Sequence, residues 1–387
     1  MHIRFKSNFV IIILFFSLSF YPGFSQEQKD EMVLAKYQIL QSKILEEEFT
    51  YLVDLPAGYE KTDKKYPVIY VMNSHMTSTF ANAVATLSQL SSEIIPQFIL
   101  VGLCNDKGRA SKYFPMRPNG ELGEADTFLK FLTDEFIPYI DQNYCTENYR
   151  ILMGQSNTGL FTVYSLLAKP TAFNAYIAAS PSLGWCLDFI KEKAITFFAE
   201  GNWEIRSLYM NYGGKDYKDL CIDPIIEFVE LLGEIAPKNF HWKMELLEQD
   251  GHVPIASLNN GLLWLFPDFW VSDEKKANGI TKLDQQFEKL TQRYGFKIEV
   301  PEEILFDMSY QLKNQKKYEE SMNISSVLME RYPRSGRGYF IFGEIHRERG
   351  EIEKAKDYYK KAVEMSPDFG AAKRRLEMLE KRDGQLN

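Results

Sequence analysis

Short apolar runs alternate with helical patterns along residues 36–270. Two of these runs, Pro67–Met72 and Phe98–Leu103, are almost continuously apolar, as is typical of strands buried on both faces of a sheet. Such alternation predicts an α/β domain with a mostly parallel central sheet, whose ligands bind beyond the carboxyl ends of the strands. The expected elements are strands at Phe49–Leu55, Pro67–Met72, Phe98–Leu103, Ile151–Met153, Ala175–Ala179 and Leu208–Tyr212, an edge strand at His241–Leu246, and a helical stretch at Glu121–Tyr144.

The N-terminal segment has a different character. Arg4 and Lys6 precede Phe9–Phe20, an almost unbroken apolar run, and small residues follow at Gly23 and Ser25. This pattern is typical of a secretory signal peptide cleaved after Ser25. The alternative is a membrane anchor, but the run is short for a span, which needs about 20 apolar residues. We therefore expect an exported chain, periplasmic or extracellular, with no stable membrane span after cleavage.

Charge and cysteine content exclude several classes of partner. The chain of 387 residues has a formal net charge of −8 and no basic cluster, so nucleic acid and anionic membrane surfaces are poor partners. The cysteines are too widely spaced for a zinc pattern or a dense disulfide framework. We expect no metal or organic cofactor and mostly buried thiols, with one disulfide left open, among Cys104, Cys145, Cys186 and Cys221.

A repeat occupies the C-terminal part of the chain. Pro333 and Pro367 lie 34 residues apart, which is the tetratricopeptide period, and residues 302–335 form a degenerate first copy. Ala371–Arg382 follows as a capping helix, and a generic helical hairpin is the alternative. In the second copy the large, small and proline positions of the signature are filled by Tyr339, Gly343, Ala355, Tyr359, Ala362 and Pro367.

These patterns divide the chain into four parts. We expect a signal peptide at 1–25, an α/β domain at 26–270, a partly helical connector at 271–300, and tetratricopeptide-like repeats at 301–387. The repeats would present a concave surface to a peptide or protein partner, or brace the larger domain.

A candidate nucleophile stands between a predicted strand and a predicted helix. The run Ile151–Met153 ends in Gly154-Gln155-Ser156, and the helical segment Leu160–Ala168 follows. This is the layout of a nucleophile elbow, in which a sharp turn exposes a serine hydroxyl. Small residues are needed beside such a turn, and Thr158 departs from the pattern because a glycine is usual at that position.

Acyl transfer by a serine needs a base to take the hydroxyl proton and an acid to orient that base. His252 lies in a turn after the predicted edge strand and suits the base of Ser156. The order Ser, Asp, His expected for this arrangement places the acid between them in sequence. Asp216, which follows two glycines at a strand end, is the first choice, with Asp219 and Asp223 as competitors. A serine–histidine pair without an acid is also open.

Two backbone N–H groups are expected to form an oxyanion hole. One belongs to Asn157, directly after the candidate nucleophile. The other is expected from the loop after Pro67–Met72, with Ser74 or His75 as donor. His75 could also contact the substrate or merely shape the rim.

Taken together, these residues resemble the esterase family of α/β-hydrolases that includes enterochelin-esterase-like and esterase-D-like proteins, feruloyl esterases and S-formylglutathione hydrolase. The resemblance implies an α/β-hydrolase fold followed by a small all-α tetratricopeptide domain. The similarity spans about 36–270 and runs through Ser42–Leu45, Leu55–Tyr59, Tyr66–Val71, Val101–Leu103, Phe136–Asp141, the elbow, Ser180–Trp185 and Gly251-His252.

The resemblance also carries residue roles. It implies that Ser156 is the nucleophile and His252 the base, while Asn73-Ser74 stands where the family often has Asp-Gly. Arg109 matches a family arginine near the site, with a salt bridge as the alternative. Trp185 either lines the acyl or alcohol pocket or belongs to the core.

The sequence thus predicts an exported serine esterase that acts on a small-molecule carboxylic ester without a cofactor. Siderophore lactones and plant polysaccharide esters are both open as substrates. The alternative is a weakly active or inactive hydrolase scaffold that binds protein or ligand through its repeats, an alternative motivated by Thr158.

Overall fold

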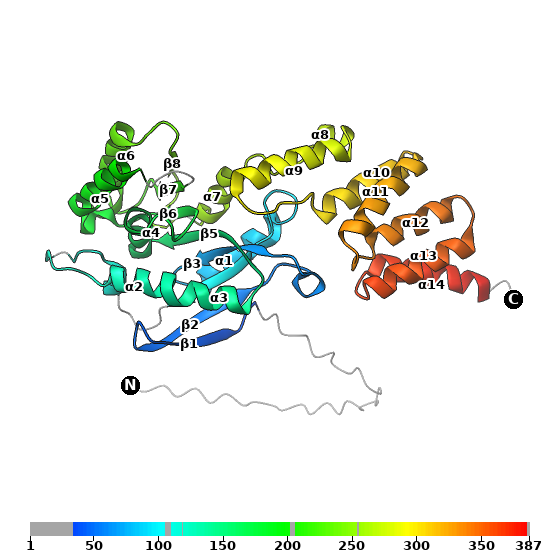
Figure 1. The fold of residues 1–387 in the computed structure, drawn as a ribbon, viewed down its shortest axis with the longest axis horizontal. Coiled ribbons are helices and arrows are strands. Elements are labelled where there is room, and N and C mark those ends of the chain that lie inside the picture. Colours follow the sequence, from blue (N-terminus) through cyan, green and yellow to red (C-terminus); the bar gives the residue numbers. More distant parts are fainter. Residues whose placement is uncertain (1–33, 105–109, 118, 202–205, 254, 385–387) are drawn as a thin grey trace, which may run out of the picture. The chain divides into compact units, whose positions relative to one another are not determined.

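A computed structural model describes residues 34–384, except 105–109, 118, 202–205 and 254. Its centre is an eight-stranded sheet with the order β1-β2-β4-β3-β5-β6-β7-β8 (Figure 1). From β4 through β8 all neighbours pair in parallel, whereas β2 is antiparallel to β4 and β1 is antiparallel to β2. The strands are β1 Tyr37–Ser42, β2 Glu47–Asp54, β3 Tyr66–Val71, β4 Ile99–Cys104, β5 Thr146–Gln155, β6 Ala175–Ala179, β7 Ser207–Gly213 and β8 His241–Leu247.

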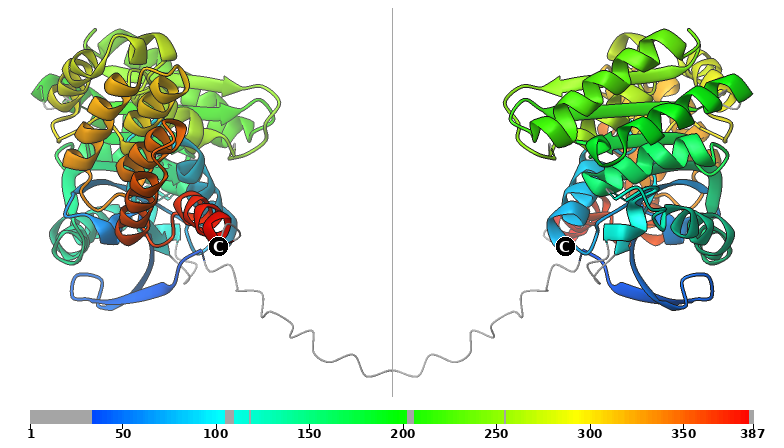
Figure 2. Two further views of the ribbon diagram at one scale, coloured as in Figure 1. Left: turned by 90° about the vertical axis from the view of Figure 1, so that its right-hand side faces the viewer. Right: turned by 90° about the vertical axis from the view of Figure 1, so that its left-hand side faces the viewer.

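Helices cover both faces of the sheet (Figure 2), as the alternating sequence pattern predicts. The alternation of side chains along β3 shows why: Val68 and Tyr70 face one hydrophobic cluster, and Ile69 and Val71 face the other. The first cluster includes α2 Ala125–Phe131, α3 Ile137–Asn143, α4 Asn157–Ala168, α5 Leu187–Glu200 and α6 Asp223–Ile235, and the second includes α1 Thr77–Leu90 and α7 Ser257–Leu265.

The expected α/β-hydrolase architecture is confirmed, and each predicted strand is found. The stretch predicted at Glu121–Tyr144 consists of α2 and α3 joined by one π-helical segment, Leu132–Phe136. The strand β1 was not predicted, because its sequence contains exposed apolar residues such as Tyr37 and Ile39 that do not mark a buried face.

The segment after the hydrolase sheet is more ordered than a connector. It contains α8 Asp273–Ala277 and α9 Ile280–Tyr294. Leu283, Phe287 and Leu290 of α9 belong to the same hydrophobic cluster as strands β3 and β5. The first repeat helices, α10 Glu302–Asn314 and α11 Tyr318–Arg331, contribute to that cluster as well. The domain boundaries remain a prediction, but the core runs continuously across residues 271–300.

The remaining helices form the expected repeat architecture. They are α12 Arg337–Glu348, α13 Ile352–Met365 and α14 Gly370–Gly384, and they share their own cluster around Tyr359. Gly343 is required by close approach, since a Cβ there would lie 2.6 Å from the ring of Tyr359. Small and large residues of the signature thus fit together across two helices, as expected from the sequence.

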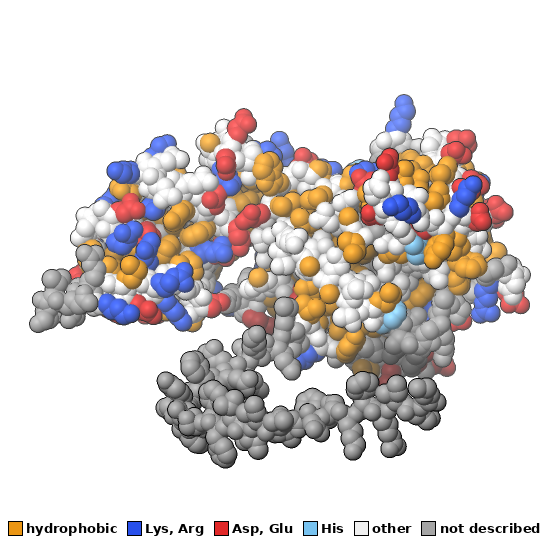
Figure 3. Space-filling view, turned by 180° about the vertical axis from the view of Figure 1, so that it is seen from behind, with side chains coloured by type: hydrophobic (Ala, Val, Ile, Leu, Met, Phe, Trp, Pro, Cys, Tyr) orange, Lys and Arg blue, Asp and Glu red, His pale blue; other side chains and the backbone are white. Residues whose placement is uncertain are grey.

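The face of the described residues seen in Figure 3 carries charges of both signs, and most of the thiols lie inside. On the face seen in Figure 3, acidic and basic side chains of the described residues are interspersed. Among the residues described, no helix combines the length and apolar character that crossing a membrane requires. No disulfide joins the four cysteines, all of which lie in the described part of the chain; three are buried as expected, but Cys145 is exposed.

Candidate active site

The turn between β5 and α4 is a nucleophile elbow in its geometry. Ser156 has φ 55° and ψ −121°, a backbone conformation that residues other than glycine rarely adopt. It persists only where the surrounding structure constrains it tightly. A Cβ at Gly154 would lie 2.1 Å from the carbonyl oxygen of Thr158, so only glycine fits there. The N–H of Ser156 donates to the carbonyl of Ala179 at 2.9 Å, which ties the turn to the end of β6.

Three side chains from three strand ends meet at this turn. His252 Nε2 lies 2.9 Å from Ser156 Oγ, and His252 Nδ1 lies 2.7 Å from Asp216 Oδ1. The Asp216 side chain is fully buried, whereas that of His252 is 27% exposed. A base that touches both a hydroxyl and a buried carboxylate is the arrangement that acyl transfer by serine requires.

The turns after β7 and β8 bring the acid and the base together. A Cβ at Gly213 would lie 2.1 Å from the carbonyl oxygen of Gly251, so the two loops pack without a side chain between them. The N–H of Val253, at φ 60°, donates to Ser180 Oγ at 3.0 Å and anchors the histidine loop. His252 therefore points back toward both Asp216 and the elbow.

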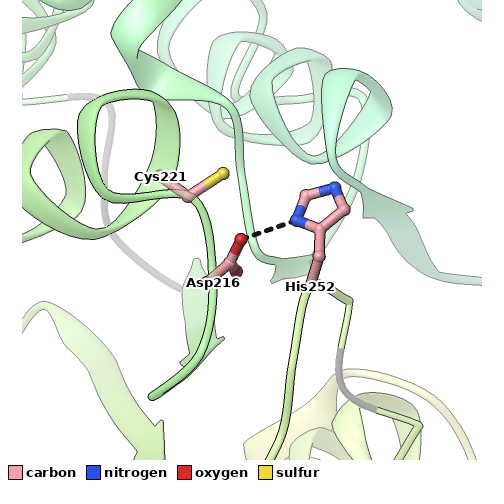
Figure 4. Close-up of side chains that lie close together, drawn as sticks. All are labelled: Asp216, Cys221 and His252. Carbon is pink, nitrogen blue, oxygen red and sulfur yellow. Dashed lines mark hydrogen bonds and ion pairs between the residues drawn. The ribbon is translucent and has the colours of Figure 1, made fainter.

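Of the three candidate acids, Asp216 is the one in contact with the imidazole. Figure 4 shows its carboxylate directed at the ring of His252. Asp219 lies in the segment Lys218–Ile222 and Asp223 begins α6, beyond the turn that faces the ring. Sequence order alone left this choice open, because three acids follow one strand end.

The oxyanion loop differs from the expectation. The N–H of Ser74 donates to the carbonyl of Leu103 at 3.0 Å, and its buried hydroxyl donates to the carbonyl of Val71. The assignment of Ser74 as oxyanion donor is therefore wrong, because its N–H is already paired with β4. Asn157 begins α4, where helix N–H groups lack partners within the helix, as expected for a donor.

Asn73 is held against the elbow by its side chain. Its Nδ2 donates to Thr158 Oγ1 at 3.2 Å, and its φ of 58° turns the chain sharply after β3. Thr158 also accepts from the N–H of Gln155 at 2.9 Å and donates to the carbonyl of Gln155 at 2.8 Å. The departure at Thr158 therefore leaves the elbow intact and braces it.

The predicted substrate contacts fall into different environments. Trp185 is 37% exposed rather than a core residue, and its Nε1 donates to Asn157 Oδ1 at 3.0 Å. His75 is exposed on the loop after β3. Arg109 lies outside the described residues. Tyr217, which the sequence did not single out, packs its ring 4.8 Å from that of His252 and is 60% exposed.

Two further residues near the triad were not predicted, Ser182 and Cys221. Ser182 Oγ lies 3.2 Å from Ser156 Oγ, and Cys221 Sγ lies 4.0 Å from Ser182 Oγ. Ser182 belongs to the segment that carried the family resemblance, but its spacing gave no sign of a role. Among the described residues, Asp216, Cys221 and His252 offer ligand atoms within 4.8 Å of one another (Figure 4), although the imidazole and the carboxylate are already paired.

Residues 42–243 match the family described as "Putative esterase", which covers more than half of the chain, and residues 336–369 match a tetratricopeptide repeat. The chain belongs to the Putative esterase family. The match ends at β8, so it includes the elbow and Asp216 but not His252.

A curated relative of this Putative esterase chain is the ferri-bacillibactin esterase BesA of Bacillus subtilis. The two are 31% identical over 164 residues, which are 37% of this chain and 54% of BesA. The siderophore enterobactin esterase of Emericella nidulans is 36% identical over 66 residues, 16% of this chain and 22% of that protein. The chain therefore matches only about half, or less, of the length of these relatives.

Solved structures show the same fold. An IroE-like serine hydrolase from Shewanella oneidensis superimposes with a TM-score of 0.63 at 23% identity, covering 77% of this chain and 99% of that one. The siderophore hydrolase EstA from Aspergillus nidulans gives 0.52 at 19% identity, covering 63% and 98%. The α/β-hydrolase fold of the chain is thus shared with both.

Proposed function

We propose that the chain is a serine esterase that hydrolyses a carboxylic ester through an acyl-enzyme on Ser156. The observation that carries this proposal is the position of His252 between the other two residues. Its Nε2 lies 2.9 Å from the hydroxyl of Ser156, and its Nδ1 lies 2.7 Å from the buried carboxylate of Asp216. Membership of an esterase family supports it. The alternative of an inactive scaffold rested on Thr158, whose hydrogen bonds keep the turn in its strained conformation.

Each group has a defined task in the reaction. Ser156 Oγ bonds to the ester carbonyl carbon while His252 Nε2 takes the hydroxyl proton, and the carbonyl π electrons move onto oxygen. The N–H of Asn157 stabilises this oxyanion together with a second backbone N–H from the loop after β3, for which His75 is the remaining candidate. The intermediate collapses and expels the alcohol, which receives the proton from His252. Water, deprotonated by His252, then releases the acid and restores the serine.

Turnover of short p-nitrophenyl esters tests the mechanism. Removing a nucleophile or base from a working serine triad typically lowers kcat by about 10⁶. Ser156→Ala and His252→Ala should therefore abolish measurable turnover, and Asp216→Asn should lower it by about 10⁴ through the wrong histidine tautomer. Ser165→Ala, a buried serine of α4 whose hydroxyl only bonds the carbonyl of Phe161, is the matched control. Equal turnover of Ser156→Ala and the wild type would overturn the proposal.

The substrate class proposed for this site is a siderophore ester. The support comes from relatives, since BesA and two fungal relatives carry names of siderophore esterases. Hydrolysis of a catecholate trilactone, with and without iron, should be compared with that of a feruloylated sugar. A clear kcat/KM preference for the feruloylated sugar would replace the siderophore assignment and leave the esterase mechanism standing.

Export and protein binding complete the proposal. The N-terminal pattern supports a signal peptide, so the mature protein recovered outside the cytoplasm should begin at Gln26. An intact Met1 on the exported protein would contradict this. The repeat supports a role for α10–α14 in binding a peptide or protein, alongside the packing of α10 and α11 on the hydrolase core.

A further inference from the structure

Ser182 is a fully buried serine beside the candidate nucleophile, outside the three residues of the triad. It lies two residues beyond Ser180 in the loop after β6. Its N–H donates to the carbonyl of Ser156 at 3.1 Å, so this loop and the elbow are fixed to each other through the backbone. That contact places Ser182 Oγ at 3.2 Å from Ser156 Oγ.

The number of available protons sets the direction of this hydrogen bond. Ser156 has one hydroxyl proton, and the reaction requires it to point at His252 Nε2. The bond between the two hydroxyls must then run from Ser182 to Ser156, with Ser182 as donor. If it ran the other way, the proton of Ser156 would point away from the base.

The other side of Ser182 meets a second protonated group. Cys221 Sγ lies 4.0 Å from Ser182 Oγ and 3.6 Å from the carbonyl oxygen of Ser180. Burial, and next the charge of Asp216, raise the pKa of the Cys221 thiol to about 12, so it remains protonated at neutral pH. A thiol donates weakly, and Ser182 Oγ, the carbonyl oxygen of Ser180 and the carboxylate of Asp216 are all acceptors for it. Ser182 is therefore free to use its own proton toward Ser156.

We propose that Ser182 is a positioning residue for the nucleophile: its hydroxyl donates to Ser156 Oγ and selects the orientation in which the Ser156 proton faces His252. This inference rests on the proposed function and extends it by one residue. Ser182 acts through Ser156 and does not exchange a proton with the substrate. The directed chain runs from Ser182 to Ser156, His252 and Asp216.

The test compares the chemical reactivity of Ser156 with and without this donor. Ser182→Ala removes the hydroxyl and little volume, while Ser182→Cys retains a weak donor. The matched control is Ser165→Ala, an equally buried serine of α4. The readouts are the rate of labelling by a fluorophosphonate probe, kcat and KM for a short p-nitrophenyl ester, the pH profile of kcat, and the melting temperature.

We expect Ser182→Ala to slow labelling and lower kcat about tenfold, with KM within twofold of the wild type. The midpoint of the acid limb of the pH profile should not move, because the contact of His252 with Asp216 is retained. Ser182→Cys should fall between the wild type and Ser182→Ala. Ser165→Ala should match the wild type in labelling and kcat.

Two outcomes would overturn the inference. One is a labelling rate in folded Ser182→Ala equal to that of the wild type. The other is a loss of kcat matched by Ser165→Ala, which would show a general effect of emptying a buried hydroxyl site. If the wild type itself is not labelled at Ser156, the proposed function fails first, so the two failures are distinguishable.

Discussion

At the scale of single residues, Thr158 explains how an elbow tolerates a β-branched residue where glycine is usual. Its hydroxyl uses one donor and two acceptor sites, which is the full capacity of the group. The partners are the N–H and carbonyl of Gln155 and the amide of Asn73. The side chain thus joins the turn that carries Ser156, the proposed nucleophile, to the loop expected to complete the oxyanion hole.

Replacing Thr158 with valine keeps its shape and removes these three bonds. Because the N–H of Gln155 loses its partner, Thr158→Val should lower the free energy of unfolding by about 1–3 kcal/mol and also lower kcat. Urea denaturation and ester turnover measure the two effects. Thr162→Val is the matched control, since that hydroxyl only bonds the carbonyl of Thr158. A stable, fully active Thr158→Val protein would show that the bridge is dispensable.

Other residues of the site show which features the sequence could predict and which it could not. A strand, a turn and a helix in order were enough to predict Ser156, His252 and the sheet edge that joins them. The hydrogen bond of the Ser74 N–H was not predictable, because its acceptor is the carbonyl of Leu103 on another strand. Asp216 could be ranked but not chosen, since the choice depends on the approach of the turns after β7 and β8.

At the scale of elements, the repeat helices are joined by one buried carboxylate. Glu344 of α12 is 1% exposed and accepts hydrogen bonds from Arg347 on its own helix, from Tyr359 of α13 and from Arg375 of α14. Burial raises the pKa of Glu344, but the hydrogen bonds from Arg347 and Tyr359 outweigh it. The pKa of this group therefore lies below its ordinary value of 4.5.

Glu344→Gln should destabilise the protein by about 1–3 kcal/mol at pH 7, where the charged group is fully paired. Because the pKa of Glu344 is lower in the folded state, its charge stabilises the folded protein at any pH above the ordinary pKa of 4.5. This contribution is lost as the pH falls through the pKa of the folded state. The difference in melting temperature from the wild type should therefore narrow below about pH 4.5. Glu364→Gln, at an exposed position of α13, should match the wild type throughout. A pH-independent difference would contradict this account.

At the scale of the molecule, the hydrolase core extends beyond the segment that the family match covers. Phe287 of α9 is 1% exposed and belongs to the cluster formed by β3, β5, α1 and α7. The sequence between 271 and 300 looked like a connector because its charged start hides the apolar face of α9. This face predicts that α9 stabilises the hydrolase sheet.

Phe287→Ala should lower the free energy of unfolding by about 3–5 kcal/mol, since it empties a buried aromatic site. The midpoint temperature of esterase inactivation in Phe287→Ala should fall together with the midpoint temperature at which the helical circular dichroism signal is lost. Lys289→Ala changes an exposed position of the same helix and should leave both transitions in place. If Phe287→Ala loses activity at the same temperature as the wild type, α9 does not stabilise the sheet that carries the candidate active site.

The most direct test of the central claim is intact-mass spectrometry of the mature chain after reaction with a fluorophosphonate probe. We predict a single adduct on the folded protein, mapped by peptide sequencing to Ser156. The adduct should be absent in Ser156→Ala and should form far more slowly in His252→Ala. No adduct on the folded wild type, or an undiminished adduct on Ser156→Ala, would contradict the assignment of Ser156 as an activated nucleophile.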